Sequence, residues 1–352
     1  MDSLRRGARR RIRRSGHRYQ CAIIVLMIAP ALDASYFTQR GFDVEEVREL
    51  TGGVSNIVLE VRHRGGVFVV KQALARLRVP GEWLADPTRV LRERDALLLL
   101  DRILPGAAPR VLWSDDDNLL FAMTAVEGPT WKQEMMAGRI DPHFAQQTGA
   151  MLGAMAGGTW RSREVETSFA PGHFFEELRI DPYYRTVAAR HPGLAPRILS
   201  LIKESHARPR ALTHGDFSPK NIIVTPAGAP VLLDFEVAHY GDPAFDIAFC
   251  LNHLSLKWFH LGEHRSRLAE SLRAFWQALS EAMPSLLPEL EALALRHLGA
   301  LMLARVDGKS PVEYLRPDEQ AAVRAFSTAL VSEPPARWDG YLDLLFAHDT
   351  NR

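Results

Sequence analysis

The sequence predicts an α+β protein of two lobes, in which a small antiparallel sheet precedes a larger helical region. Short β-branched segments and tight turns predominate as far as residue 124. Long segments with apolar residues at helical spacing predominate after residue 129. The chain has 352 residues, of which 47% are hydrophobic, so it is long and apolar enough to fill two lobes.

The first lobe is expected to centre on a hairpin that ends in Lys71. Arg64-Gly65-Gly66 supplies a tight turn between two β-branched segments, and the second segment ends in that lysine. In chain order, the expected elements are a helix and a strand within 35–50, strands at 57–61 and 67–71, a helix at 88–103, and strands at 110–114 and 119–124.

Three consecutive acids, Asp115, Asp116 and Asp117, lie between the last two of these strands. They are compatible with a metal site or with a hairpin turn in water. We favour the turn, because aspartate followed by asparagine is common where a hairpin reverses.

The second lobe is expected to be helical apart from three short strands. Helices are expected at 142–155, 196–204, 265–283 and 287–306, and strands at 211–213, 222–224 and 231–233. The sequence therefore divides into an extension at 1–34, a first lobe at 35–126 and a second lobe at 127–352.

Charge and cysteine content exclude several classes of protein. Residues 1–18 hold eight arginines and one acid, so the remaining residues carry a net charge of about −6. A mildly acidic body argues against nucleic-acid binding. Two cysteines, Cys21 and Cys250, form neither a disulfide framework nor a metal motif, and we expect Cys250 to be a buried, inert thiol.

The first residues allow three interpretations. The basic segment is followed by an apolar stretch at 21–32, which is too short to span a bilayer as a helix. It is compatible with a signal peptide, with translation that starts at Met27, or with a disordered basic arm. In each case, we expect no stable membrane association.

The most specific motif is His214-Gly215-Asp216-Phe217-Ser218-Pro219-Lys220-Asn221. An aspartate followed five residues later by an asparagine has the spacing of a phosphoryl-transfer loop. Asp216 is suited to accept or orient the proton of an acceptor hydroxyl. Asn221 offers a neutral carbonyl oxygen to Mg²⁺.

Further along, Asp234 ends an apolar strand 18 residues after Asp216. A carboxylate in that place is suited to hold Mg²⁺ against the phosphates of ATP. One such aspartate is weak evidence by itself, but its order after the loop and a hairpin makes a specific constellation.

Residues of the first lobe complete the predicted ATP site. Lys71 is the candidate phosphate-binding lysine, and Glu93, early in the next helix, is its candidate ion-pair partner. The segment Gly52-Gly53-Val54-Ser55-Asn56 is placed to cover the phosphates, because glycine permits close backbone approach and Ser55 and nearby amides can donate hydrogen bonds.

Together these motifs resemble the aminoglycoside phosphotransferase and choline kinase-like family, which has the protein-kinase-like fold. The resemblance covers roughly residues 47–256. It implies that the segment containing Met123 and Ala125 contacts adenine and that Asp246 braces the catalytic loop without reacting itself. It also implies ATP and Mg²⁺ as cofactors and a cytoplasmic enzyme, because ATP is cytosolic.

Departures from protein kinases point away from protein substrates. His-Gly-Asp, Asp-Phe-Glu and a Gly-Gly loop replace H-R-D, D-F-G and GxGxxG. Lys220 either adds a phosphate contact or faces solvent. A silent nucleotide-binding pseudokinase is the alternative function, but such proteins usually lose a catalytic or metal-binding residue, and here none of those is lost.

The acceptor is expected to be a small soluble alcohol, such as an aminoglycoside-like molecule, a sugar or an amino alcohol. Asp181 or Tyr184 is a candidate to line its pocket, although their segment also fits a helix end that packs on the lobe. Negative charge from Glu236, Asp181 and Glu177 would favour a cationic or neutral acceptor. The oligomeric state stays open.

Overall fold

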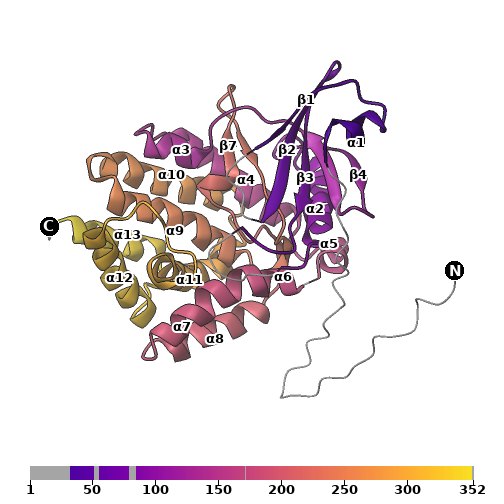
Figure 1. Cartoon of the computed structure of the whole chain (residues 1–352). Coiled ribbons are helices and arrows are strands. Elements are labelled where there is room, and N and C mark those ends of the chain that lie inside the picture. Colours follow the sequence, from indigo (N-terminus) through magenta and orange to yellow (C-terminus); the bar gives the residue numbers. More distant parts are fainter. Residues whose placement is uncertain (1–31, 51–54, 79–84, 171, 351–352) are drawn as a thin grey trace, which may run out of the picture.

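The protein has two lobes, a β-sheet lobe and a helical lobe, which lie side by side (Figure 1). The structure is a computed structural model that describes residues 32–50, 55–78, 85–170 and 172–350. The α+β class predicted from the sequence is confirmed.

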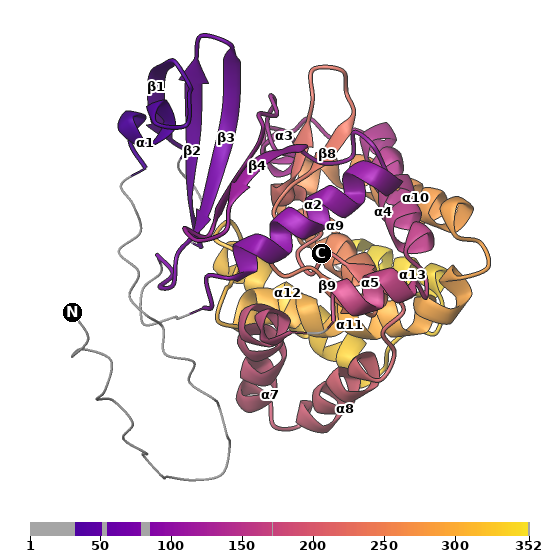
Figure 2. The ribbon, with the colours of Figure 1, turned by 90° about the vertical axis from the view of Figure 1, so that its right-hand side faces the viewer.

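The first lobe is a five-stranded antiparallel sheet with the order β1-β2-β3-β5-β4. Lys71 on the central strand faces Val58 on one neighbour and Phe121 on the other. The helix α2 lies between the sheet and the helical lobe (Figure 2). The elements are α1 Ala34–Thr38, β1 Val44–Glu49, β2 Asn56–His63, β3 Gly66–Ala73, α2 Arg89–Ile103, β4 Val111–Asp115 and β5 Leu120–Thr124.

The second lobe is helical, with two small two-stranded sheets that hold the loops of the site. Its longest helices pack in pairs, α4 on α10 and α9 on α11. The helices are α3 Trp131–Met136, α4 Pro142–Gly158, α5 Arg163–Ser168, α6 His173–Phe175, a π-helix Glu176–Arg185, α7 Thr186–Arg190, α8 Ala195–His206, α9 Ala244–His260, α10 Arg265–Ala282, α11 Leu287–Asp307, α12 Pro317–Ser332 and α13 Trp338–Thr350. The strands are β6 Ala211–Thr213, β7 Ile222–Val224, β8 Pro230–Leu232 and β9 His239–Gly241, and short 3-10 helices lie at Pro219–Asn221 and Gly262–His264.

One apolar core runs from the inner face of the sheet into the helical lobe. Val69, Phe121 and Leu97 of the sheet lobe belong to the same buried cluster as Phe217 and Leu254 of the helical lobe. A separate cluster fills the outer face of the sheet, where α1 covers it. Burial of this shared core holds the two halves of the site in a fixed relation.

The chain crosses between the lobes at a glycine. Gly128 has a φ of +132°, and a Cβ there would meet the carbonyl oxygen of Val224 at 2.1 Å. The next residue, Pro129, accepts a hydrogen bond of 2.9 Å from the amide of Val224. We therefore propose the lobe boundary between Val126 and Glu127, which gives lobes at 35–126 and 127–352.

The elements expected from the sequence are present, and a π-helix adds to them. The acids at 115–117 end β4 and turn into β5, as we expected, and no group of three or more His, Cys, Asp or Glu side chains in the described ranges could hold a metal ion. The π-helix Glu176–Arg185 was not expected. None of the described helices is both long and apolar enough to cross a bilayer.

Candidate active site between the lobes

Three charged residues join the sheet to the helical lobe. The Lys71 ammonium lies 2.6 Å from Oε2 of Glu93 on α2 and 2.5 Å from Oδ1 of Asp234. Lys71 and Glu93 are almost fully buried, whereas the side chain of Asp234 is 24% exposed. The structure thus brings together the predicted lysine, its predicted partner and the predicted metal ligand.

Lys71 and Asp234 each stabilise the charged form of the other. Burial alone would raise the pKa of Asp234, but Lys71 and Lys220 outweigh it and hold that pKa well below its usual range. Burial would likewise lower the pKa of Lys71, yet Asp234 and Glu93 raise it. Lys71 is therefore a cation and Asp234 an anion at neutral pH.

Asp234 is also held in a backbone conformation that side chains rarely adopt. Its φ is +71°, in the left-handed region. Such a residue costs on the order of 1–2 kcal/mol and persists only when its surroundings determine it. The strain is consistent with a carboxylate that is aimed at a site rather than left in a relaxed turn.

The carboxylate of Asp216 is crowded on one oxygen only. Oδ2 lies 2.9 Å from Arg179 Nη2, 2.9 Å from Lys220 Nζ and 2.9 Å from Asn221 Nδ2. Among the described residues, no hydrogen bond reaches Oδ1. Burial opposes ionisation, but Arg179 and Lys220 keep the pKa of Asp216 below its usual value. Oδ1 is thus a charged acceptor atom without a protein partner.

The loop that carries Asp216 is braced from α9. Asp246 accepts hydrogen bonds from the amides of His214 at 2.5 Å and Gly215 at 2.8 Å. Gly215 has a φ of +78°, and a Cβ there would meet Val237 at 2.8 Å, so this position requires glycine. The geometry agrees with the brace that the family resemblance implied for Asp246.

His214 is a neutral part of the same brace. Its Nδ1 accepts from the amide of Asp216 at 3.0 Å, and its Nε2 donates to the carbonyl of Leu233 at 3.0 Å. Burial lowers the pKa of His214 to about 4. This imidazole therefore links the Asp216 loop to the residue before Asp234.

Ser55 and Asn56 meet the helical lobe beside Asp234. Asn56 Nδ2 donates to Ser55 Oγ and to Glu236 Oε2, both at 3.0 Å. Arg89 of α2 is fully buried, and its Nε donates to the same Glu236 oxygen at 3.0 Å, while its Nη2 reaches the carbonyl oxygen of Ser55. Gly52 and Gly53, predicted to cover the phosphates, lie outside the described residues.

A cavity of about 140 Å³ opens beside these groups, between the lobes. Its lining combines the charged site with apolar side chains of the sheet and of α2, as an adenine nucleotide requires: Val58, Lys71, Glu93, Leu97, Pro109, Met123, Asn221, Leu233 and Asp234. Met123, predicted to contact adenine, lines this cavity. Ala125, just after β5, is half-buried and does not line this cavity.

The oxygen atoms present fit Mg²⁺. Asn221 uses its amide nitrogen to bond Asp216, which turns its carbonyl oxygen away from that carboxylate. Asn221 and Asp234 line one cavity. One or two protein oxygens, completed by water and phosphate, are the usual protein share of a Mg²⁺ site.

Two of the three acids predicted to attract a cationic acceptor are paired with arginines. Glu236 pairs with Arg89, and Asp181 pairs with Arg185 on the protein surface. Tyr184 is buried and bonds His297 Nδ1 at 2.6 Å, which agrees with the packing alternative for its segment. Glu236 and Asp181 therefore carry no uncompensated negative charge, whereas Glu177, the third acid of the prediction, has no ion pair among the described residues, and burial raises its pKa.

Two arginines of the site were missed by sequence reasoning. Arg179 lies on the π-helix and Arg89 on α2, both far along the chain from the acids that they pair with. The only sequence feature that could have indicated these two arginines is that each lies in a segment with apolar or aromatic neighbours. Lys220, for which we left two readings open, is half-exposed and pairs with Asp216.

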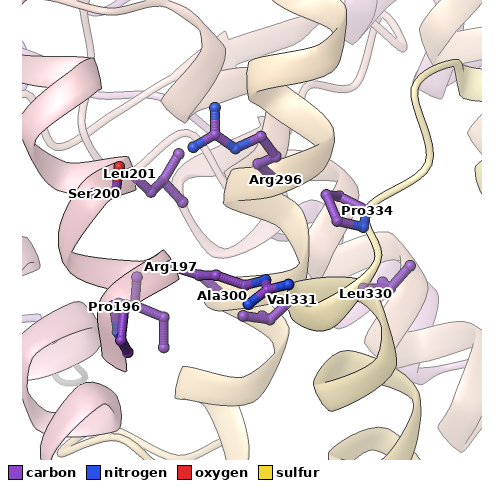
Figure 3. A pocket seen from close by; sticks show the side chains of 10 residues that line it. Pro196, Arg197, Ser200, Leu201, Arg296, Ala300, Leu330, Val331 and Pro334 are labelled. Atoms are coloured by element: carbon purple, nitrogen blue, oxygen red, sulfur yellow. The ribbon is translucent and has the colours of Figure 1, made fainter. Parts of the chain in front are cut away.

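A larger cavity lies away from this site. It has a volume of about 360 Å³ and is surrounded by side chains of α8, α11 and α12, together with Pro334 after α12 (Figure 3). Arg197 and Arg296 contribute its charge. None of the candidate site residues described above lines this cavity. Cavity size alone would therefore not identify the candidate active site.

Comparison with known proteins identifies the family. The model of the phosphotransferase enzyme family, APH, matches residues 46–293, which is well over half of the chain. The chain therefore belongs to this family. The match contains both the Lys71–Glu93–Asp234 group and the Asp216 loop.

The curated relatives are kinases of a small sugar. Methylthioribose kinase 2 of Oryza sativa subsp. japonica is 26% identical over 252 residues, which cover 63% of this chain and 59% of that protein. The methylthioribose kinase of Escherichia coli is 26% identical over 246 residues, which cover 61% and 58%. The chain thus spans about three fifths of the length of the curated relatives it matches.

Solved structures with the same fold include an amicoumacin kinase in complex with AMP-PNP and Ca²⁺. It is 16% identical, the match covers 87% of this chain and 95% of that one, and the TM-score is 0.52. An aminoglycoside phosphotransferase of Alicyclobacillus acidocaldarius is 14% identical, with 88% and 94% covered and a TM-score of 0.52. These similarities show that the chain has the protein-kinase-like fold.

Proposed function

We propose that this protein is an ATP- and Mg²⁺-dependent phosphotransferase that phosphorylates a hydroxyl group of a small soluble molecule in the cytoplasm. The observation that carries the proposal is the open oxygen of Asp216 beside the Lys71–Asp234 pair. Family membership supports it, because the relatives named above are kinases of small molecules.

The nucleotide end of the site is assigned to four residues. Lys71 binds phosphate oxygens as a fixed cation, and Glu93 of α2 holds the Lys71 ammonium by a hydrogen bond of 2.8 Å. Asp234 and Asn221 hold Mg²⁺ through oxygen atoms. When bound, Mg²⁺ neutralises the charge of the phosphates and keeps them in line for transfer.

The acceptor end is assigned to Asp216. Its Oδ1 accepts a hydrogen bond from the acceptor hydroxyl and orients that oxygen toward the γ-phosphorus. The acceptor oxygen then bonds to phosphorus, the bond to the ADP oxygen breaks, and the hydroxyl proton leaves toward Asp216. Arg179, Lys220 and Asn221 fix the carboxylate through Oδ2, so Oδ1 stays in place.

The silent pseudokinase is the competing function. It predicts nucleotide binding without transfer. It has less support, because Lys71, Asp216, Asn221 and Asp234 are all present and lie within one connected site.

The test is an ADP-formation screen against sugars, amino alcohols and aminoglycosides, with and without Mg²⁺. We expect Mg²⁺-dependent ADP formation that at least one acceptor stimulates, over slow hydrolysis without acceptor. Binding of Mg·ATP with no stimulation by any alcohol would favour the pseudokinase. Efficient phosphorylation of a peptide library, with no small alcohol active, would overturn the proposal.

A further inference from the structure

The helical lobe carries a second group of charged and aromatic residues next to Arg179. It consists of Tyr183 on the π-helix, His253 and Lys257 on α9, Arg305 near the end of α11, and Tyr314 in the loop after it. We call these five residues the cationic cluster. Helices α9 and α11, which supply three of them, pack directly against each other.

The cationic cluster is joined to the Asp216 carboxylate through one aromatic ring. The guanidinium carbon of Arg179 lies 6.0 Å from the centre of the Tyr183 ring, and that of Arg305 lies 5.6 Å from it. The Tyr183 hydroxyl accepts a hydrogen bond of 3.1 Å from Arg305 Nη1. Arg179 also contacts Asp216, so Tyr183 is a shared neighbour of Arg305 and of the arginine that holds the Asp216 carboxylate.

Two cations of the cluster lack an acidic partner. Arg179 and Lys220 share Asp216, and Lys132 on α3 pairs with Glu313. In the part of the chain that the structure describes, neither Arg305 nor Lys257 has a carboxylate within ion-pair distance. Positive charge is therefore in excess around Tyr183 and Tyr314.

Polar atoms of the same residues are buried without partners. Arg305 donates from Nη1 to Tyr183 and Ser310, whereas its Nε has no hydrogen-bond partner among the described residues. The same holds for the hydroxyl of Tyr314, for which the described part of the chain supplies no partner. Lys257 is 1% exposed; its ammonium donates to the carbonyl of His253 on its own helix at 3.4 Å and lies 5.5 Å from the centre of the Tyr314 ring. Buried donors without acceptors are costly, and an anion would satisfy them.

The remaining groups do not compensate this charge. Burial and the surrounding Arg305 and Lys257 hold the pKa of His253 well below its usual value, so its imidazole is neutral. Burial, and then Lys132, lower the pKa of Lys257 to about 7. Glu319, the other acid near Tyr314, is already paired with His260 and Arg316.

We infer that the acceptor of this enzyme is an anionic alcohol, whose carboxylate or phosphate group binds to Arg305 and Lys257 while its hydroxyl reaches Asp216. The inference rests on the proposed function and replaces the cationic or neutral acceptor expected from the sequence. Arg305 supplies a planar fork with a free Nε edge, and Lys257, whose pKa of about 7 a bound anion would raise, supplies a second positive charge in the same cluster.

The test compares acceptors that share a carbon skeleton and differ in charge: sugars, the corresponding sugar acids and sugar phosphates, and amino sugars. ADP formation is measured with saturating Mg·ATP. We expect kcat/KM to be at least about tenfold higher for the acids or the phosphates than for the neutral and amino sugars. The better of the two anionic sets tells whether the site takes a carboxylate or a phosphate.

Variants of Lys257 and Arg305 then test where the anionic group of the acceptor binds. Lys257→Met and Arg305→Gln should each raise KM for the anionic acceptor at least about tenfold and leave KM for ATP unchanged. Arg305→Lys, which keeps the charge, should recover part of the loss. Lys203→Met removes an exposed lysine of α8 and should change neither constant.

The outcomes distinguish failure of this inference from failure of the proposed phosphotransferase function. A neutral or amino sugar as the best acceptor overturns the inference and leaves the kinase intact. Variants at 257 and 305 that fold but keep the KM of the anionic acceptor also overturn it. Absence of ADP formation with every acceptor, and of Mg·ATP binding, refutes the proposed function itself.

Discussion

The ammonium group of Lys71 lies 2.5 Å from Oδ1 of Asp234, so a residue of the central strand and a residue of the helical lobe form a direct, nearly buried ion pair. Glu93 holds the same ammonium group from α2. In the function proposed above, this contact joins the groups that would bind phosphate and metal, whereas Asp216 is assigned to the acceptor. The two ends can therefore be separated by mutation.

Asp216→Asn should lower the transfer rate by a factor on the order of 10²–10⁴ and leave the affinity for Mg·ATP almost unchanged. The reason is that Asp216 contacts the acceptor hydroxyl, while the nucleotide is held by other groups. Asp234→Asn should weaken Mg·ATP binding as well as turnover. Calorimetry on each variant, combined with initial rates, measures both effects. Equal losses of nucleotide affinity in the two variants would show that this division of roles is wrong.

Arg89→Met should destabilise the fold by about 3–5 kcal/mol, because it leaves Glu236 buried without its counter-charge and removes a donor to the carbonyl of Ser55. The double variant Arg89→Met with Glu236→Gln should recover part of that loss. Urea unfolding provides the free energies.

Arg102→Met is the matched control on the same helix. Its ion pair with Glu164 is exposed on both sides, so the change should cost no more than about 1 kcal/mol. If removal of Arg89 costs as little as removal of Arg102, the buried pair does not stabilise the contact between the lobes.

Asp246→Asn should reduce kcat by up to about 100-fold without raising KM for ATP. Asparagine has one side-chain acceptor oxygen, so only one of the amides of His214 and Gly215 stays bonded and the loop shifts. Steady-state kinetics separate this positioning role from nucleotide binding. A raised KM for ATP with an unchanged kcat would contradict it.

His239→Gln should make the stability of the protein less sensitive to acid. Burial lowers the pKa of His239 to about 4, although the Val237 carbonyl that accepts from Nδ1 acts in the opposite direction. Because the folded protein binds this proton less readily than the unfolded chain, the stability due to neutral His239 is lost as pH falls from about 6.5 to about 4.

The effect of His239 on the pH dependence of stability is best measured as a difference between the wild type and His239→Gln. Buried acids with raised pKa values, such as Asp242 and Asp246, act in the opposite sense on the total stability. The difference in unfolding free energy between wild type and His239→Gln should shrink by up to about 3 kcal/mol between pH 7 and pH 4. A difference that stays constant with pH would contradict the assignment.

The sequence was sufficient to single out the candidate site residues that belong to a local motif. Asp216 and Asn221 share one loop, Asp234 ends a strand, and Lys71 ends a hairpin, so each has a pattern that a single segment displays. Glu93 was harder, because four charged residues are consecutive there, and only the packing of α2 shows which of them faces Lys71.

Residues that act across long chain separations could not be predicted. Arg179 reaches Asp216 and Arg89 reaches Glu236 only after the lobes have packed. The π-helix adds a further difficulty, because its wider turn changes which residues share a face. As a result, Tyr183 contacts Arg179 and Arg305, whereas the candidate Tyr184 packs into the core.

The most direct test of the central claim is calorimetric titration of the wild-type protein with ATP, with and without Mg²⁺, repeated on Asp234→Asn. We expect binding that Mg²⁺ strengthens at least about tenfold in the wild type, and loss of that Mg²⁺ effect in the variant. Nucleotide binding that is absent, or equally strong with and without Mg²⁺, would contradict the assignment of this site as a phosphotransferase centre.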